Sequence, residues 1–250
     1  MTKARLGIWD GVRAFFGGVG FVITTPRVWG WSLVPVAVAL VLGGGLGAIG
    51  VWGASRAADA MFSGDSGWAE AARWTLGVLL ALVALLVAFV ITVSLAQPIS
   101  GFALDRVVRA QAKALGSMTD APEVPLAAQL KRSLGVTLTA LVIGLPVLAL
   151  LTVIELFAPP AAVVTIPLKF VVSGLMLAWD FLDYPLGARA ATVGDRVHFV
   201  RDHLGAVTAF GVLGAFTLLV PGLGLLLLPM GAAGATRMVL ESEWRAGQPR

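Results

Sequence analysis

Residues 32–51 have the sequence SLVPVAVALVLGGGLGAIGV, a run that contains no charged side chain. A helix of about 20 apolar residues covers about 30 Å, the thickness of the hydrocarbon core of a bilayer. Trp31 and Trp52 flank the run, and tryptophan is typical of the two interfaces between membrane and water. Residues 31–52 are therefore predicted to span a membrane.

The composition of the whole chain supports the same class of protein. Of the 250 residues, 58% are hydrophobic and 13% are charged, and the mean hydropathy is +0.91. Soluble domains carry about 25% charged residues, so a soluble fold does not fit this composition. The chain has no cysteine, which excludes disulfides and thiolate metal sites. The sequence predicts an all-α integral membrane protein that forms a single membrane domain over residues 1–250.

A second uncharged run, TLGVLLALVALLVAFVITVSLA, predicts another span at residues 74–96. Two segments beside these spans have an amphipathic pattern. Residues 1–30 are expected to form an interfacial helix, with Asp10, Arg13 and Gly17 on its polar face. Its apolar face would carry Ile8, Trp9, Val12, Phe15, Phe16 and Val19. Residues 97–133 are expected to form a cytoplasmic amphipathic helix and loop, and a helical extension of the second span is the alternative.

Two further apolar segments, residues 134–184 and 204–238, are each too long for one span. Pro159-Pro160 interrupts the first, and Pro221-Gly222-Leu223-Gly224 interrupts the second. Proline ends or kinks a helix and glycine permits a turn, so each segment is predicted to be a helical hairpin. Neither turn carries a charge, which suggests hairpins that penetrate the bilayer only partly. Two ordinary pairs of full spans are the alternative.

Basic residues predict the orientation of these segments. They concentrate in the N-terminal region, in residues 97–133, in the connector at residues 186–203 and in the C-terminal tail, whereas residues 53–73 hold only Arg56 and Arg73. Cytoplasmic loops are enriched in lysine and arginine. Both termini and the connector are therefore expected in the cytoplasm, and residues 53–73 outside.

Four stretches, taken in order, resemble one known family. They are GVGFVITTPRVWGWSLVPVAV (18–38), SLAQPISGFALDRV (94–107), MLAWDFLDYP (176–185) and LLVPGLGLLLLPMGAAGATRM (218–238). The chain is similar along nearly its whole length to the CysZ-type sulfate permeases and to the wider group named after an etoposide-induced protein.

The resemblance implies a bacterial inner-membrane protein with two long membrane helices and two pairs of partly penetrating helices, assembled as a homodimer or larger homo-oligomer. It also implies sulfate uptake that supplies sulfur assimilation. One departure concerns the substrate. The sulfate-transporting members carry a Gly-x-Arg-Arg motif after a proline before the first span, whereas here Pro26 is followed by Arg27, Val28 and Trp29. The family's sulfate site is therefore not transferred to this chain.

Three groups of polar residues are candidates for function. Arg13 and Arg27 precede the first span and could attract an anion, or anchor the chain to lipid phosphate. Glu155 and Lys169 lie on opposite arms of the first hairpin, where each needs a partner; an ion pair is the favoured arrangement, with a polar path and snorkelling as alternatives. The end of the same hairpin carries Asp180, Asp183, Tyr184 and Arg189, and Asp183 is expected to bind backbone N–H groups or Arg189.

No nucleotide-binding loop, nucleophile elbow or metal-binding motif occurs in the sequence, so neither an enzyme nor a cofactor or metal site is expected. The expected partners are the lipid bilayer, a small inorganic anion and further copies of the chain, without nucleic acid. Two functions are considered. One is a permease or channel for sulfate or a related small anion, and the other is a non-transporting membrane assembly or stress-related protein on the same fold.

Overall fold

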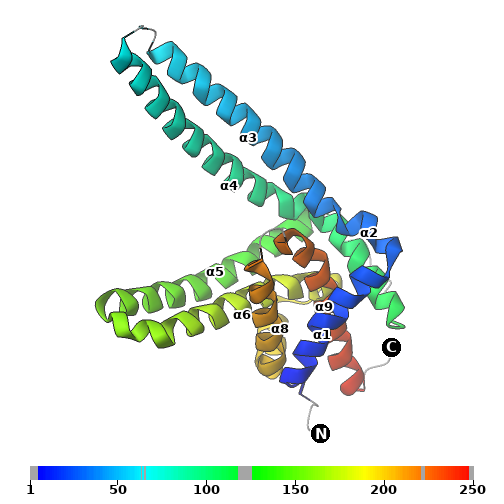
Figure 1. The fold of residues 1–250 in the computed structure, drawn as a ribbon. Coiled ribbons are helices and arrows are strands. Elements are labelled where there is room, and N and C mark those ends of the chain that lie inside the picture. Colours follow the sequence, from blue (N-terminus) through cyan, green and yellow to red (C-terminus); the bar gives the residue numbers. More distant parts are fainter. Residues whose placement is uncertain (1–4, 63, 65, 118–125, 221–222, 248–250) are drawn as a thin grey trace. The chain divides into compact units, whose positions relative to one another are not determined.

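The computed structural model describes residues 5–62, 64, 66–117, 126–220 and 223–247, and this part of the chain is helical and contains no β-strand (Figure 1). The helices are α1 (Ile8–Thr24), α2 (Pro26–Ser32), α3 (Val34–Met61), α4 (Gly67–Ala114), α5 (Leu126–Phe157), the 3₁₀ turn η1 (Pro159–Ala161), α6 (Ala162–Ala188), α7 (Val193–Asp202), α8 (Leu204–Leu218) and α9 (Leu223–Arg245). The sequence-based prediction of an all-α membrane protein is confirmed.

The chain divides into two compact units. Unit 1 comprises residues 1–32 and 103–250, and unit 2 comprises residues 33–102. Helix α4 contributes to both units, because the boundary falls within it. Each unit is described by itself below.

Unit 2 consists of α3 and the first part of α4, which pack side by side (Figure 1). Their backbones approach closely at Gly50, where an added Cβ would lie 2.9 Å from the Cβ of Ala84. Segments Pro26–Met61 and Gly67–Thr92 are both long and apolar enough to cross a membrane. Their outward surface carries many large apolar side chains, as expected of helices that contact lipid, among them Leu40, Val41, Ile49, Leu82, Leu86 and Phe89.

Helix α4 does not end with the second apolar run but continues to Ala114. The extension of the second span is thus the arrangement that the structure shows for the helical part of residues 97–133, and the loop at residues 118–125 lies outside the described part of the chain. The extension has one buried and one exposed face. Leu104, Val107 and Val108 are buried, whereas Arg106 and Lys113 are exposed.

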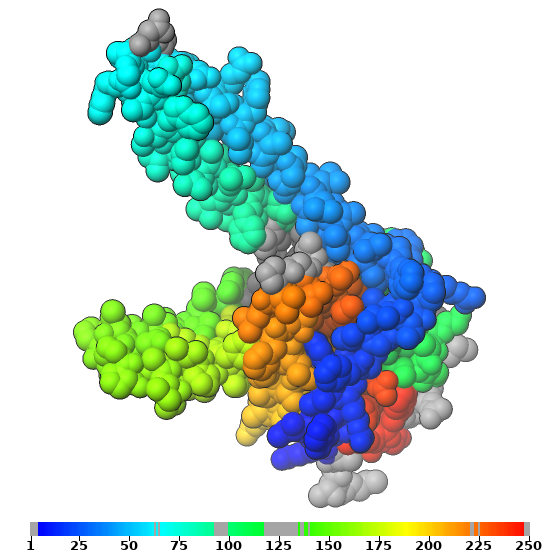
Figure 2. All heavy atoms as spheres, in the orientation of Figure 1, coloured from blue at the N-terminus to red at the C-terminus, as the bar shows by residue number. Residues whose placement is uncertain are grey.

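The first predicted hairpin is present as α5 and α6, which are joined by η1 at Pro159–Ala161 (Figure 1). The two prolines initiate this turn because proline fixes φ and lacks an N–H donor. In the space-filling view the hairpin projects as an arm beyond α8 (Figure 2), and large apolar side chains such as Phe157 and Val163 are exposed on it. Pro159–Ala188 is the third segment with the length and composition of a membrane span, so either depth of penetration stays compatible with the fold.

Helix α1 differs from its predicted role in one respect. Asp10, assigned to a polar outer face, is buried together with Gly11, Ala14 and Gly18 against α8 and α9. Small side chains let the helix backbones approach, and an added Cβ at Gly11 would collide with the backbone oxygen of Ala206 in α8. Large apolar side chains of α1 face outward instead, including Ile8, Trp9 and Phe16.

The core of unit 1 lies where α1, α6, α8 and α9 meet. Phe15, Phe181 and Phe210 come from three of these helices and pack edge to face, with the Phe210 ring 5.9 Å and 6.1 Å from the other two centroids. Val207 and Met238 are fully buried beside them. This core fixes the end of α6, which carries the candidate polar residues.

The second predicted hairpin corresponds to α8 and α9, although its Pro221-Gly222 turn lies outside the described residues. Helix α9 continues past the predicted boundary at residue 238 and ends at Arg245. The added turns carry polar and charged side chains, and these contact α1 and α6. Residues 239–245, assigned from the sequence to a C-terminal tail, are therefore part of the packed structure of unit 1.

Close contact between α6 and α8 generates the first testable prediction. A Cβ at Gly211 would collide with the backbone oxygen of Gly174 and lie 3.0 Å from the Cβ of Ala178. Because backbone cannot move aside as a side chain can, Gly211→Ala should lower the stability of detergent-purified protein by about 1–3 kcal/mol. Thermal unfolding followed by circular dichroism measures this loss.

Gly20→Ala is the matched control, since Gly20 is also helical and nothing lies within 4 Å of its added Cβ. It should be neutral or stabilising by up to about 1 kcal/mol, as alanine is the better helix former. Equal melting temperatures for the two variants would contradict the close helix contact.

Candidate functional site

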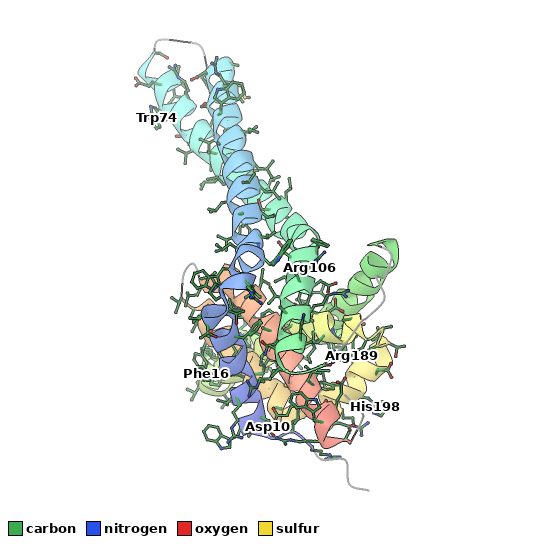
Figure 3. The ribbon with its side chains drawn as sticks, turned by 90° about the vertical axis from the view of Figure 1, so that its right-hand side faces the viewer. Asp10, Phe16, Trp74, Arg106, Arg189 and His198 are labelled. Carbon is green, nitrogen blue, oxygen red and sulfur yellow. The ribbon has the colours of Figure 1, made fainter. Side chains whose placement is uncertain are left out.

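Charged residues from three distant parts of the sequence meet at one end of unit 1. This polar end is formed by the start of α1, the connection from α6 to α7 and the end of α9. Figure 3 labels Asp10 of α1, Arg189 directly after α6 and His198 of α7, and all three lie toward the same end of the unit. The backbone N–H of Leu6 donates to Nδ1 of His203 at 3.1 Å, which ties the N-terminal segment to the start of α8.

Arg245 joins the two ends of the chain. Its Nη1 and Nη2 donate to the two carboxylate oxygens of Asp10 at 3.0 Å and 2.6 Å, a bidentate contact between α9 and α1. Nη2 also donates to Glu241 at 2.7 Å. The same Asp10 carboxylate accepts the backbone N–H of Gly7 at 2.7 Å and so caps α1.

This contact lowers the pKa of Asp10 below its ordinary value of 3.8, mainly because of the hydrogen bond from Arg245 and against the opposing effect of burial. The pKa of Arg245 is raised for the same reason. A carboxylate whose pKa is lowered by folding stabilises the fold fully above its unfolded pKa, and this stabilisation is lost as the pH falls through the folded pKa. The pairing is therefore complete at neutral pH.

Asp10→Asn should accordingly lower the melting temperature at pH 7, because it removes one charge from a pair that closes the fold. The difference between wild type and variant should shrink below pH 3.8, where the wild-type carboxyl group also becomes protonated. Melting curves of both proteins between pH 7 and pH 3 measure this. A difference that stays constant over the whole range would show that the charge of Asp10 contributes nothing.

Arg189 connects the end of α6 with α9. Its Nε and Nη2 donate to the two carboxylate oxygens of Glu243 at 2.5 Å and 3.1 Å. Nη1 donates to the backbone oxygen of Pro185 at 2.9 Å, so the guanidinium also satisfies a carbonyl in the last turn of α6. Arg189 thus stabilises the chain reversal, as expected, but its carboxylate partner is Glu243.

The expected partner of Asp183 was Arg189 or the backbone, and in the structure Asp183 forms an ion pair with Arg196 of α7. Only 1% of the Arg196 side chain is exposed, so its charge needs a partner close by. Thr192 and Asp195 cap α7 reciprocally and hold Arg196 in place, with the pKa of Asp195 lowered chiefly by the hydroxyl of Thr192. The connector therefore packs against α6 rather than forming a plain surface loop.

Asp180 and Tyr184 lie within one turn of Asp183 and are half-buried. Within the part of the chain that the structure describes, Asp180 makes no hydrogen bond or ion pair, and the charge nearest to it is that of Asp183. The three predicted residues are thus close together, but only Asp183 has a cationic partner.

Arg13 and Arg27 are both exposed and lie apart. Arg13 is in the first half of α1, and Arg27 is in α2, beyond the other end of α1. Arg13 and Thr24 are 11 positions apart, which corresponds to about 16 Å of helix. The structure does not bring these two candidate anion-attracting arginines into one site.

Glu155 of α5 and Lys169 of α6 form a direct ion pair across the first hairpin, which confirms the favoured arrangement. Their side chains are 25% and 24% exposed. Glu155 is two residues from the end of α5 and Lys169 is the eighth residue of α6, so both Cα atoms lie within about 12 Å of the hairpin tip. How much this ion pair contributes to stability therefore depends on how deep the hairpin tip lies in the bilayer.

Replacing either partner tests that depth. If the tip lies within the bilayer, Glu155→Gln or Lys169→Met leaves an unpaired charge in a medium of low dielectric constant, at a cost of about 3–5 kcal/mol. A tip in water would reduce the cost to about 0–1 kcal/mol. We expect the large loss in each single variant and recovery of most of it in the double variant, measured by thermal unfolding in lipid nanodiscs. Additive losses in the double-mutant cycle would contradict direct coupling.

Sequence reasoning missed four residues of the polar end: Asp10 as a buried group, Arg196, Glu243 and Arg245. Each falls in a segment that was assigned to an interface, a connector or a tail. A signal was available for two of them: the capping residue Thr192 lies four positions before Arg196, and Glu241 lies four positions before Arg245. That spacing predicts a helix but not its partner.

Comparison with known proteins places the chain in a family. The sequence model described as "Sulfate transporter CysZ/Etoposide-induced protein 2.4" matches residues 14–229. A protein named "Sulfate transporter CysZ" from Pseudomonas paraeruginosa is 27% identical over 171 residues, which are 68% of this chain and 69% of the relative. Two proteins of the same name from strains of Pseudomonas aeruginosa are 26% identical over the same lengths. Because the match covers most of the sequence, the chain belongs to the sulfate transporter CysZ/etoposide-induced protein 2.4 family.

Proposed function

We propose that this protein is a permease or channel that carries sulfate or a related small oxyanion across a bacterial cytoplasmic membrane and so supplies sulfur assimilation. The observation that carries this proposal is the family match over residues 14–229, together with relatives that are named sulfate transporters. The three apolar helical segments of membrane-spanning length support it. No catalytic step is needed for this function.

Reconstitution tests the proposal directly. Purified protein in liposomes should take up radiolabelled sulfate faster than protein-free liposomes, and unlabelled sulfate should compete. Sulfite and phosphate, added as further competitors, identify how broad the anion selectivity is, and chloride tests whether a single charge suffices. Uptake equal to that of liposomes with an unrelated membrane protein would contradict transport and favour the assembly or stress-related function.

The orientation in the membrane is part of the proposal. The polar end of unit 1 contains the start of α1, α7 and the end of α9, which are the segments that charge asymmetry assigns to the cytoplasm. Ion pairs that link these segments support a common side for them. The end of unit 2 around Gly64 and Ser66 then faces outward, and both termini are cytoplasmic.

Single-cysteine labelling checks this orientation, since the chain has no native cysteine. With a membrane-impermeant maleimide added to intact cells, Ser66→Cys should be labelled and Ser117→Cys should be protected until the membrane is permeabilised. Ala161→Cys, at the tip of the first hairpin, should also resist the external reagent if that hairpin penetrates only partly. Labelling at Ser117→Cys from outside would contradict the orientation, and rapid labelling at Ala161→Cys would identify full spans.

Assembly as a homodimer or larger homo-oligomer is also proposed. A quarter of each side chain of the Glu155–Lys169 pair is exposed in the single chain, on a hairpin whose other surface is apolar. Exposed charge on a lipid-facing surface is costly, so protein or water has to cover the pair. A neighbouring copy of the same chain is the cover that the family resemblance suggests.

A further inference from the structure

A cation that the protein has not already neutralised favours the binding of a small oxyanion, and the structure contains a candidate in α9. We propose that Arg237, with the buried amide of Gln111 on α4, binds a tetrahedral oxyanion in unit 1. The inference rests on the proposed function for the identity of the anion. The residues themselves are identified by their contacts and burial.

Seven cations of the described residues already have a partner that competes with an anion. Five pair with a carboxylate, and two lie over tryptophan rings: Arg109, Lys169, Arg189, Arg196 and Arg245 in the first group, Arg56 and Arg106 in the second. Five more are exposed to solvent, where binding an ion gains little: Arg5, Arg13, Arg27, Lys113 and Arg201. Two half-buried arginines, Arg73 and Arg237, are left.

Arg73 lies in an unsuitable setting for an anion. It lines a groove of about 460 Å³ between α3 and α4, and Asp59 and Glu70 line the same groove. Two carboxylates outweigh one guanidinium there and repel a divalent anion. By contrast, Arg237 makes no hydrogen bond or ion pair with the residues that the structure describes. Glu241, the carboxylate one turn away on α9, is already bound by Arg245.

The position of Arg237 is fixed by α1. An added Cβ at Gly17 would lie 2.8 Å from Cδ and from Nη1 of Arg237 and 3.1 Å from Nε. The arginine side chain therefore lies flat on the backbone of α1, in a space that exists because residue 17 has no side chain. A planar guanidinium held in this way keeps N–H donors available for two oxygens of one anion.

The second observation is a buried polar group, the side-chain amide of Gln111 on α4. Gln111 is 2% exposed, and its Oε1 is buried without a hydrogen-bond partner in the described part of the chain. Val107 and Ala233 belong to one buried cluster, and Gln111 and Arg237 each follow one of these residues by four positions. Helices α4 and α9 run in the same direction in this unit (Figures 1 and 3), so both polar side chains lie one turn beyond the cluster.

The chemistry of the two groups fits an oxyanion. A buried polar group without a partner is costly, and a bound ligand removes that cost. A glutamine amide can turn its N–H₂ donors toward an anion as readily as its oxygen. Guanidinium and amide donors together bind a tetrahedral oxyanion with charge-assisted hydrogen bonds. Free sulfate and the phosphate of a lipid headgroup share this chemistry.

Equilibrium binding of radiolabelled sulfate to purified protein in lipid-free detergent tests the site. Arg237→Gln should weaken sulfate binding about tenfold or more, the factor expected for a lost charged hydrogen bond. Arg237→Lys keeps the charge without the planar donors and should retain part of the affinity. The matched control is Arg201→Gln, which removes an exposed arginine of α7 and should bind sulfate as the wild type does.

Gly17→Ala is a second variant that leaves every charge in place. Its Cβ displaces the flexible end of Arg237, so it should lower sulfate affinity by an intermediate factor while the melting temperature stays near that of the wild type. This variant keeps the proposal testable if Arg237→Gln does not fold.

A parallel arm separates the two sources of the anion. Short-chain phosphatidylglycerol is titrated into the same variants, and stabilisation of the protein against heat is measured. Loss of sulfate binding in Arg237→Gln supports a sulfate site, and loss of lipid stabilisation with sulfate binding unchanged supports a headgroup site. Sulfate and lipid responses that both equal the wild type's would overturn the inference. Wild-type protein that neither binds nor transports sulfate contradicts the proposed function instead, whatever the lipid arm shows.

Discussion

Ion pairs link the helices of unit 1, and the arrangement of its polar end follows from them. Taking an isolated charge into a low-dielectric environment costs several kcal/mol, so a fully buried charge such as that of Arg196 needs an opposite one nearby. In the described residues, pairs join α5 with α6, α6 with α7, α6 with α9, and α1 with α9. The last three of these pairs lie at the polar end and link the helices that meet there.

Helix packing in the apolar part of unit 1 depends on glycine residues, whose lack of a side chain lets helix backbones approach closely. Hydrocarbon surrounds an apolar helix as readily as another helix does, so close van der Waals contact has to supply the attraction. Gly174 and Gly211 bring the backbones of α6 and α8 together, and Gly11 does the same for α1 and α8. The aromatic cluster around Phe210 then fills the space beside these contacts.

Sequence reasoning found the features that depend on local pattern. Uncharged runs identified both long helices of unit 2, and Pro159-Pro160 identified the turn of the first hairpin. The pairing of Glu155 with Lys169 followed because both lie in one apolar hairpin near its only break. Partners that come from distant segments were not found. Asp10 and Arg245 are separated by 235 positions, and no periodicity in either helix indicates the other.

The position of Asp10 on α1 was misassigned for a related reason. The amphipathic pattern placed Asp10 on a polar face, whereas the helix packs through Gly11, Ala14 and Gly18 and buries Asp10 with them, while Trp9 and Phe16 are exposed. Glycine contributes little to a hydrophobic pattern, although it permits the closest contacts. A helix that meets lipid on one side and protein on the other has two apolar surroundings, and only the size of its side chains distinguishes them.

The contact between Asp10 and Arg245 can form only late in the synthesis of the protein, because the two residues are 235 positions apart. Helix α1 emerges from the ribosome well before its packing partners α8 and α9. At a translation rate of about 5–20 residues per second, α1 waits roughly 10–50 s for them. Its outward Ile8, Trp9 and Phe16 give it a surface on which to rest at the membrane during that interval. The hairpin of α3 and α4 is complete long before, so unit 2 can insert while unit 1 is still being translated.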